Sequence, residues 1–133
     1  MHGYVLMFES KVEPFGQFVK LVDRIHHCSQ LSATAMAEID MDPSFLRLAE
    51  TIHQKVDQFE FELRTELTRL GIEPPAPGDD PEIAFRSALI LVLQSYQRAL
   101  KSNIPAHARA MLTRQNEEMQ KVYEELLALS RAA

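Results

Sequence analysis

Prolines and glycines interrupt this 133-residue chain at three places, and these interruptions constrain its fold more than any other feature. They lie at Asp42-Pro43, in the stretch from Gly71 to Pro81, and at Ser102-Asn103-Ile104-Pro105. Because proline and glycine are the strongest breakers of regular structure, three interruptions predict four separate segments. In three segments, apolar residues recur at alternating steps of three and four, the period of an amphipathic helix. The sequence therefore predicts an all-α protein with four helices.

The interruptions also predict where the helices begin and end. Asp42 and Asp80 each precede a proline, which places a capping carboxylate at the N-cap and a preset φ at the first helical position. Leu70-Gly71-Ile72 has the form of a glycine C-cap, followed by an apolar residue that can fold back onto the last turn. The predicted helices span residues 15–39, 43–70, 81–101 and 105–131. Residues 1–14 are expected to be an arm or a leader ahead of a bundle at 15–133.

Composition and charge exclude several functional classes. A hydrophobic content of 46% can fill one core, so we expect a single domain. The net charge of −5 disfavours nucleic acid as a partner, because phosphate binding needs a concentrated basic field. The apolar run from Ala88 to Leu93 is far shorter than the roughly 20 residues that cross a bilayer, so no membrane is expected. The N-terminus lacks a basic start and a small-residue cleavage signature, which favours a cytoplasmic protein.

The third segment differs from the others because residues 88–93 are apolar all round. A helix of this kind must be covered on more than one side. Either the connection at 71–81 packs over it or a second subunit does, and we expect a homodimer. The N-terminal arm could also dock on a neighbour through apolar side chains. These are Tyr4, Val5, Leu6 and Phe8.

Cys28 is the only cysteine, so no disulfide can form within the chain. Its neighbours His26 and His27 could lower the pKa of the thiol or help it bind a metal. Most free cysteines are small buried hydrophobes, and this structural interpretation is the one we favour for Cys28.

Three stretches of the sequence resemble a known family: ELRTELTRLGIEPP at 62–75, SYQRAL at 95–100 and IPAHARAMLTRQ at 104–115. They are similar to the bacterial ferritin-like four-helix-bundle proteins of unknown function, and the resemblance covers about residues 15–132. It implies an antiparallel up-down four-helix bundle. Relatives among ferritin-like proteins carry carboxylates and histidines in the mid-core, where they hold paired metals.

A dinuclear site of this kind needs a Glu from each of two helices and Glu-x-x-His from each of the other two. Three-residue spacing places both side chains of that motif on one face of a helix. The chain supplies the motif once, as Glu50 and His53. The corresponding core positions are neutral: Ser29, Ser32, Leu91, Ser95 and Gln115. We therefore predict no metal, no cofactor and no catalytic residue, and we expect neither oxidase activity nor iron storage.

Glu50 and His53 share a stripe with Asp57, Glu60 and Arg64, beside the apolar seam of the second helix. This pattern is typical of a solvated flank. The alternative is a mononuclear or subunit-bridging metal site, in which His53 supplies a neutral imidazole nitrogen and Glu50 a carboxylate oxygen.

Ser29, Ser32 and Gln115 are predicted to form a polar layer in the core. Such a layer could be the relic of a ligand site, or it could fix the helix register. We favour the second interpretation, because small hydroxyls can bond to carbonyls of their own helix. Replacement of Gln115 by leucine should then leave the fold intact or stabilise it.

Two functional classes remain. The leading one is a non-catalytic interaction or stress-associated bundle, since no Gly-rich phosphate loop and no nucleophile elbow occurs. Its working surface would be the apolar third helix or the acidic face of the fourth. That face carries Glu117, Glu118, Glu124 and Glu125. The alternative is a metal-binding ferritin-like protein in iron handling or redox chemistry.

Overall fold

The computed structural model contains four helices, and no strand occurs in the residues it describes. They are α1 (His2–Met36), α2 (Pro43–Arg69), α3 (Phe85–Lys101) and α4 (Ala106–Ala132). The structure describes the backbone of residues 2–38, 42–73 and 84–132, and their side chains except for residues 2–14, 130 and 132. The prediction of an all-α protein with four helices is confirmed.

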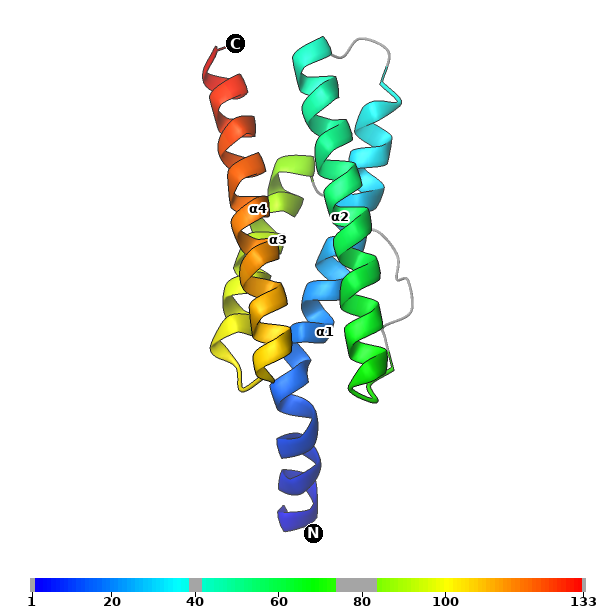
Figure 1. Cartoon of the computed structure of the whole chain (residues 1–133), viewed down its shortest axis with the longest axis vertical. Helices are drawn as coiled ribbons and strands as arrows, with labels where there is room; N and C mark the ends of the chain where they lie inside the picture. The colour runs from blue at the N-terminus through cyan, green and yellow to red at the C-terminus, as the bar shows by residue number, and fades with distance from the viewer. Residues whose placement is uncertain (1, 39–41, 74–83, 133) are drawn as a thin grey trace.

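The helices form a bundle in which α1 packs against α2 and α3, and α4 packs against the same two helices. Figure 1 shows α1 and α4 ascending while α2 and α3 descend, so helices in contact run in opposite directions. The rings of Phe45 and Phe85 lie 6.5 Å apart, which places the N-terminal ends of α2 and α3 together. α2 and α3 therefore run in the same direction, whereas in a strict up-down order each helix runs opposite to the one before it. Residues 74–83, outside the described part, join the lower end of α2 to the upper end of α3.

Both ends of α2 follow the predicted signals. The carboxylate of Asp42 accepts a hydrogen bond from the Ser44 backbone N–H at 2.8 Å, and Pro43 occupies the first helical position. Gly71 has a φ of +78°, a conformation that glycine adopts without strain. The Ile72 N–H then bonds to the Leu67 carbonyl at 2.8 Å, which closes the C-terminal turn. Asp80 lies outside the described residues, and α3 starts after Ala84 without a side-chain cap.

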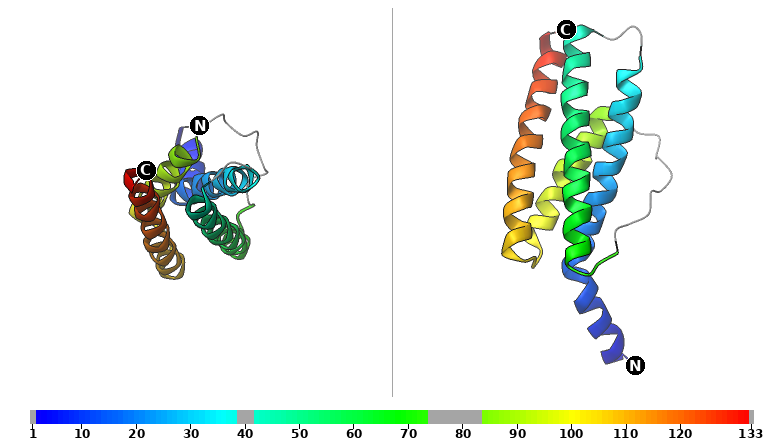
Figure 2. Two further views of the ribbon diagram at one scale, coloured as in Figure 1. Left: turned by 90° about the horizontal axis from the view of Figure 1, so that it is seen from above. Right: turned by 45° about the vertical axis from the view of Figure 1, so that its right-hand side comes forward.

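The first helix is longer at its N-terminus than predicted. It was expected at 15–39, whereas α1 begins at His2 and ends at Met36. A proline removes one backbone donor and bends a helix without always ending it, so Pro14 does not mark a boundary here. Figures 1 and 2 show the start of α1 projecting beyond the other helices. The side chains expected to form a docking arm (Tyr4, Val5, Leu6 and Phe8) lie outside the described ones.

Each helix buries one apolar stripe in a common core. On α3 the burial is incomplete: Leu89 and Val92 are fully buried, Leu91 is half-buried, and Ile90 is 36% exposed. The outer side of the apolar run is therefore open to solvent. None of the described helices is both long and apolar enough to span a membrane.

Candidate functional site

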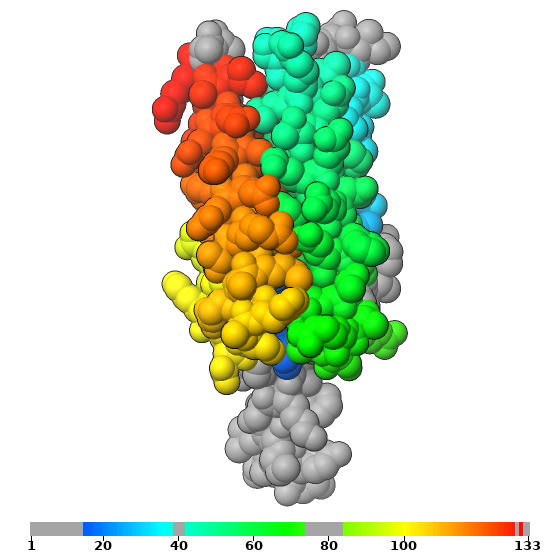
Figure 3. Space-filling model, viewed as in Figure 1, coloured from blue at the N-terminus to red at the C-terminus, as the bar shows by residue number. Residues whose placement is uncertain are grey.

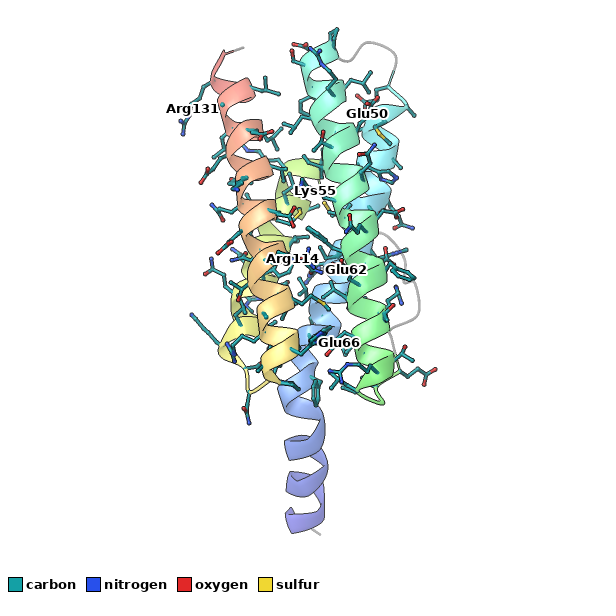
Figure 4. The ribbon with its side chains drawn as sticks, in the orientation of Figure 1. Glu50, Lys55, Glu62, Glu66, Arg114 and Arg131 are labelled. Carbon is teal, nitrogen blue, oxygen red and sulfur yellow. The ribbon has the colours of Figure 1, made fainter. Side chains whose placement is uncertain are left out.

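Four side chains from α2, α3 and α4 form a hydrogen-bonded chain from the middle of the core to the surface, which we call the core network. The Tyr96 hydroxyl donates to Oε1 of Gln115 at 2.8 Å. The Gln115 amide donates in turn to Oε1 of Glu62 at 2.8 Å, and the Arg114 guanidinium donates to the same oxygen at 2.9 Å. Figure 4 shows Glu62 and Arg114 reaching toward each other between α2 and α4. Tyr96 and Gln115 are fully buried, so their polar groups depend on each other.

The protonation states in the core network follow from its surroundings. Burial raises the pKa of the Tyr96 phenol well above its usual value, so Tyr96 remains a neutral donor. Partial burial also raises the pKa of Glu62, but hydrogen bonds from Gln115 and Arg114 and the charge of Arg114 lower it by more. Glu62 is therefore an ionised acceptor at neutral pH.

At the height of the core network, the bundle core is lined mainly by apolar and neutral side chains. Two contacts, His26 with Glu60 and Ser29 with Asp57, fix the position of α1 along α2. Cys28 of α1 therefore lies at about the same height in the bundle as the buried ring of Phe59 of α2. Tyr96 and Gln115 are fully buried in the same core. Among the described residues, no group of three or more His, Cys, Asp or Glu side chains is placed to hold a metal ion. Glu62 reaches the core but already accepts from three donors: Gln115, Arg114 and Gln58.

The environment of Cys28 supports a structural role. Burial raises the pKa of its thiol to about 12. The neighbouring histidines therefore do not activate the thiol: His26 bonds to Glu60 at 2.9 Å, and Nδ1 of His27 lies 3.8 Å from a carboxylate oxygen of Asp23.

A second group of polar side chains lies between α1 and α2, and we call it the seam network. Glu60 accepts a hydrogen bond from Arg64 at 2.8 Å and pairs with His26 at 2.9 Å. The Ser29 hydroxyl donates to Asp57 at 3.3 Å. The sequence predicted a solvated flank for this stripe, which is wrong for Glu60 and His53 because both are partly buried against α1. A stripe beside an apolar seam becomes part of an interface when the neighbouring helix packs close to it.

His53 of the seam network is held in a defined orientation. Its Nδ1 atom lies 2.9 Å from the Ser32 hydroxyl oxygen and 3.1 Å from the Ser29 carbonyl oxygen. Since the Ser32 hydroxyl donates to the Ser29 carbonyl at 2.8 Å, the consistent assignment has Nδ1 protonated and donating. The Nε2 atom then carries the lone pair. Glu50 is exposed one turn nearer the start of α2 (Figure 4).

The three residues of the predicted polar layer are all buried: Ser29, Ser32 and Gln115. The structure divides them between the two networks, because α1 and α4 lie diagonally across the bundle. Ser32 bonds to a carbonyl of its own helix as expected, while Ser29 donates across to α2. Gln115 instead bonds to Tyr96 and Glu62, which sequence reasoning did not single out.

Glu66, one turn beyond Glu62 on α2, is a further polar residue that the sequence did not reveal. It is 3% exposed, and Arg69 donates two hydrogen bonds to its carboxylate, at 2.9 and 2.5 Å. His107 at the start of α4 lies 3.3 Å from the same carboxylate. The hydrogen bonds from Arg69, opposed by burial and aided by His107, lower the pKa of Glu66. This cluster ties the lower ends of α2 and α4 together.

The upper ends of α2 and α4 enclose a shallow groove of about 420 Å³, on the face seen in Figure 3. Its lining is Ser44, Arg47, Leu48, Thr51, Glu125, Ala128 and Leu129. The volume lies within the range of small-ligand sites. However, a cation and a carboxylate share its walls, so charge favours no one class of ligand.

Comparisons with known protein families, with curated proteins and with solved structures give no significant match for this chain. Its function must therefore be argued from its own residues.

Proposed function

We propose that this chain is a non-catalytic helical interaction protein, with a ferritin-like topology and no dinuclear metal site. The observation that carries this proposal is the core network. It holds Tyr96, Gln115 and Glu62 in neutral or charge-compensated hydrogen bonds in the bundle core, the region in which ferritin-like bundles carry their metal ligands.

The order of the helices supports the ferritin-like part of the proposal. A ferritin-like bundle has one long crossover, whereas simple up-down bundles have only short loops. Here α2 and α3 run in the same direction, so the one long connection, residues 74–83, links opposite ends of the bundle (Figure 1). The opposite directions of neighbouring helices in Figure 1 also support this part of the proposal.

The charge pairing of the inner carboxylates supports the loss of metal chemistry. Glu60 is paired with Arg64, Glu62 with Arg114, and Glu66 with Arg69. A metal ion would have to compete with an arginine at each of these carboxylates. These glutamates therefore act as structural ion pairs between and along helices.

The test is metal loading, measured on protein purified without a histidine tag. After incubation with Fe(II), Mn(II) or Zn(II) and gel filtration, we expect less than one equivalent of metal by elemental analysis. We also expect no oxygen-dependent absorbance change after iron addition. Two tightly bound equivalents that disappear in Glu62→Gln would refute the proposal, because the core would then hold the dinuclear site after all.

The proposal includes a homodimer. The start of α1 projects beyond the bundle, where no other described helix packs against it. Sedimentation equilibrium over a wide concentration range is expected to give twice the mass of one chain. A sample that stays monomeric at high concentration would remove the dimer, without affecting the assignment of the core.

One observation favours a second candidate function, a mononuclear metal site at His53. Its Nδ1 donates to a backbone carbonyl, as in many metal-bound histidines, and its Nε2 lone pair remains for a cation. Glu50 would add a carboxylate, with the other ligands from water or a second copy. Metal content that falls in both Glu50→Ala and His53→Ala, but not in the exposed control Gln54→Ala, would support this site. Equal content in all samples would exclude it.

A further inference from the structure

The side of α3 that faces away from the core carries an exposed set of residues, which we call the α3 outer face. Figure 2 shows α3 in a peripheral position, and α1 and α4 are the helices that pack against it. The outer face is formed by Arg86, Ile90, Gln94, Gln97, Arg98 and Lys101, all of them exposed. Their spacing of three and four places them on one side of the helix.

This face is basic, although the whole chain has a net charge of −5. No Asp or Glu occurs between residues 85 and 101. In the part of the chain that the structure describes, Arg86, Arg98 and Lys101 take part in no ion pair. The neighbouring Arg109 of α4 donates to the carbonyls of Leu100 and Ser102 and adds positive charge at the lower end.

Helix stability accounts for only part of this charge. Arg98 and Lys101 lie in the last turn, where cations interact favourably with the helix dipole. Arg86 lies in the first turn, where a cation interacts unfavourably with the helix dipole. The acidic residues that precede it in the sequence, Asp79, Asp80 and Glu82, lie outside the described residues.

An apolar side chain lies between these cations. Ile90 is 36% exposed and, with Phe61, is one of two large apolar side chains exposed among the described residues. Next to it, Leu91 is only half-buried. An apolar centre with cations at both ends is complementary to a helix that carries an apolar stripe flanked by carboxylates.

Other partners fit this face less well. Two copies packed through α3 around a two-fold axis at the middle of the face would bring Arg86 of one copy opposite Lys101 of the other. Like charges would then meet at both ends of the interface. A nucleic acid would leave the apolar centre unused and would meet repulsion from the rest of an acidic chain.

We propose that the α3 outer face docks an acidic amphipathic helix of a partner protein. This inference rests on the proposed interaction function and specifies the chemistry of the partner. Ile90 contacts the apolar stripe of the docked helix, and Arg86, Arg98 and Lys101 pair with its carboxylates.

The test uses a fluorescent peptide of about 15 residues, the length at which isolated helices become stable. In this peptide, leucines recur at alternating steps of three and four residues, and glutamates occupy positions between them. A control peptide carries lysine in place of each glutamate. We expect the full chain to bind the acidic peptide in an anisotropy titration, and the lysine peptide at least about tenfold more weakly. Added salt should weaken the acidic complex.

Two double variants with the same charge change locate the site. Arg86→Glu with Lys101→Glu should weaken binding about tenfold or more, and Ile90→Ser should also weaken it. The matched control, Arg47→Glu with Lys121→Glu, changes two exposed cations outside the face and should keep the affinity within about twofold. Circular dichroism melts of each variant check that the bundle is folded.

Equal affinity in the face variant and the matched control would overturn the inference, and so would tighter binding of the lysine peptide. Tighter binding of duplex DNA at the same residues, or dissociation of a dimer by Arg86→Glu with Lys101→Glu, would assign the face to another occupant and also overturn it. These failures leave the proposed function standing, because that proposal is tested separately by metal content.

Discussion

Replacement of Gln115 by leucine is the sharpest test of how the core is held together. The sequence alone predicts that this substitution is tolerated, whereas the structure predicts a loss of stability. Gln115 is fully buried and is the acceptor for the buried Tyr96 hydroxyl. A buried donor that loses its acceptor costs about 1–3 kcal/mol. The apolar surface of leucine offsets about 1 kcal/mol of this cost.

We therefore expect Gln115→Leu to lower the free energy of unfolding by about 1 kcal/mol, since Glu62 retains its bond from Arg114. Tyr96→Phe should lower it by about 1–2 kcal/mol, because the Gln115 carbonyl oxygen then lacks its donor. The double variant removes both partners and should lie within about 1 kcal/mol of the natural protein. The coupling between the two sites is then about 2 kcal/mol.

Urea unfolding followed by circular dichroism at pH 7 measures all four proteins of this cycle. The chain has no tryptophan, so helix content is the practical signal. Equal slopes of free energy against urea would show that only stability has changed. A Gln115→Leu variant as stable as the natural protein, or effects that add without coupling, would refute the hydrogen-bond argument.

Three further predictions follow from single contacts. The pKa values of Glu62 and Glu66 are lowered in the folded state, so their contribution is present above the unfolded value of about 4.3 and is lost as pH falls below it. The free energy of unfolding in urea should differ less between pH 7 and about pH 3.5 in Glu66→Gln than in the natural protein. The same difference in both proteins would contradict this prediction. The Cys28 thiol, with its pKa raised to about 12, should react with a thiol reagent only after unfolding, and fast reaction of the native protein would show that it is accessible. Asp42→Ala should cost about 1 kcal/mol while Asp42→Asn costs less, because only alanine removes the acceptor for the Ser44 N–H, and equal stability would exclude a capping role.

The helices could be predicted from the sequence because their signals are local. The Asp42 cap and the glycine turn at Gly71 depend on residues a few positions apart, and the structure has both. The predicted start of the first helix at residue 15 was wrong, because a proline such as Pro14 does not show in sequence whether the chain continues as a bent helix. The direction of α3 could not be predicted either, since a connection of this length can return alongside α2 or cross to its other end.

To predict the polar contacts of the core, one must know which helices are neighbours as well as which residues face inward. Ser29, Ser32 and Gln115 lie on the inner stripes of their helices, which periodicity shows correctly. That pattern suggested one layer, but a layer forms only if α1 and α4 are neighbours, and in this bundle they are diagonal.

The position of Glu62 shows most clearly why the site could not be derived from the pattern. Its α-carbon lies beside the apolar stripe of α2, where a glutamate usually points to solvent. Its long side chain reaches inward only because Gln115 on α4 offers an amide and Arg114 compensates its charge. Each of these residues is unremarkable in the sequence, and the network follows from packing α4 against α2. The middle of the core therefore contains polar side chains, and the Glu62 carboxylate there is bound by donors from the neighbouring helix α4.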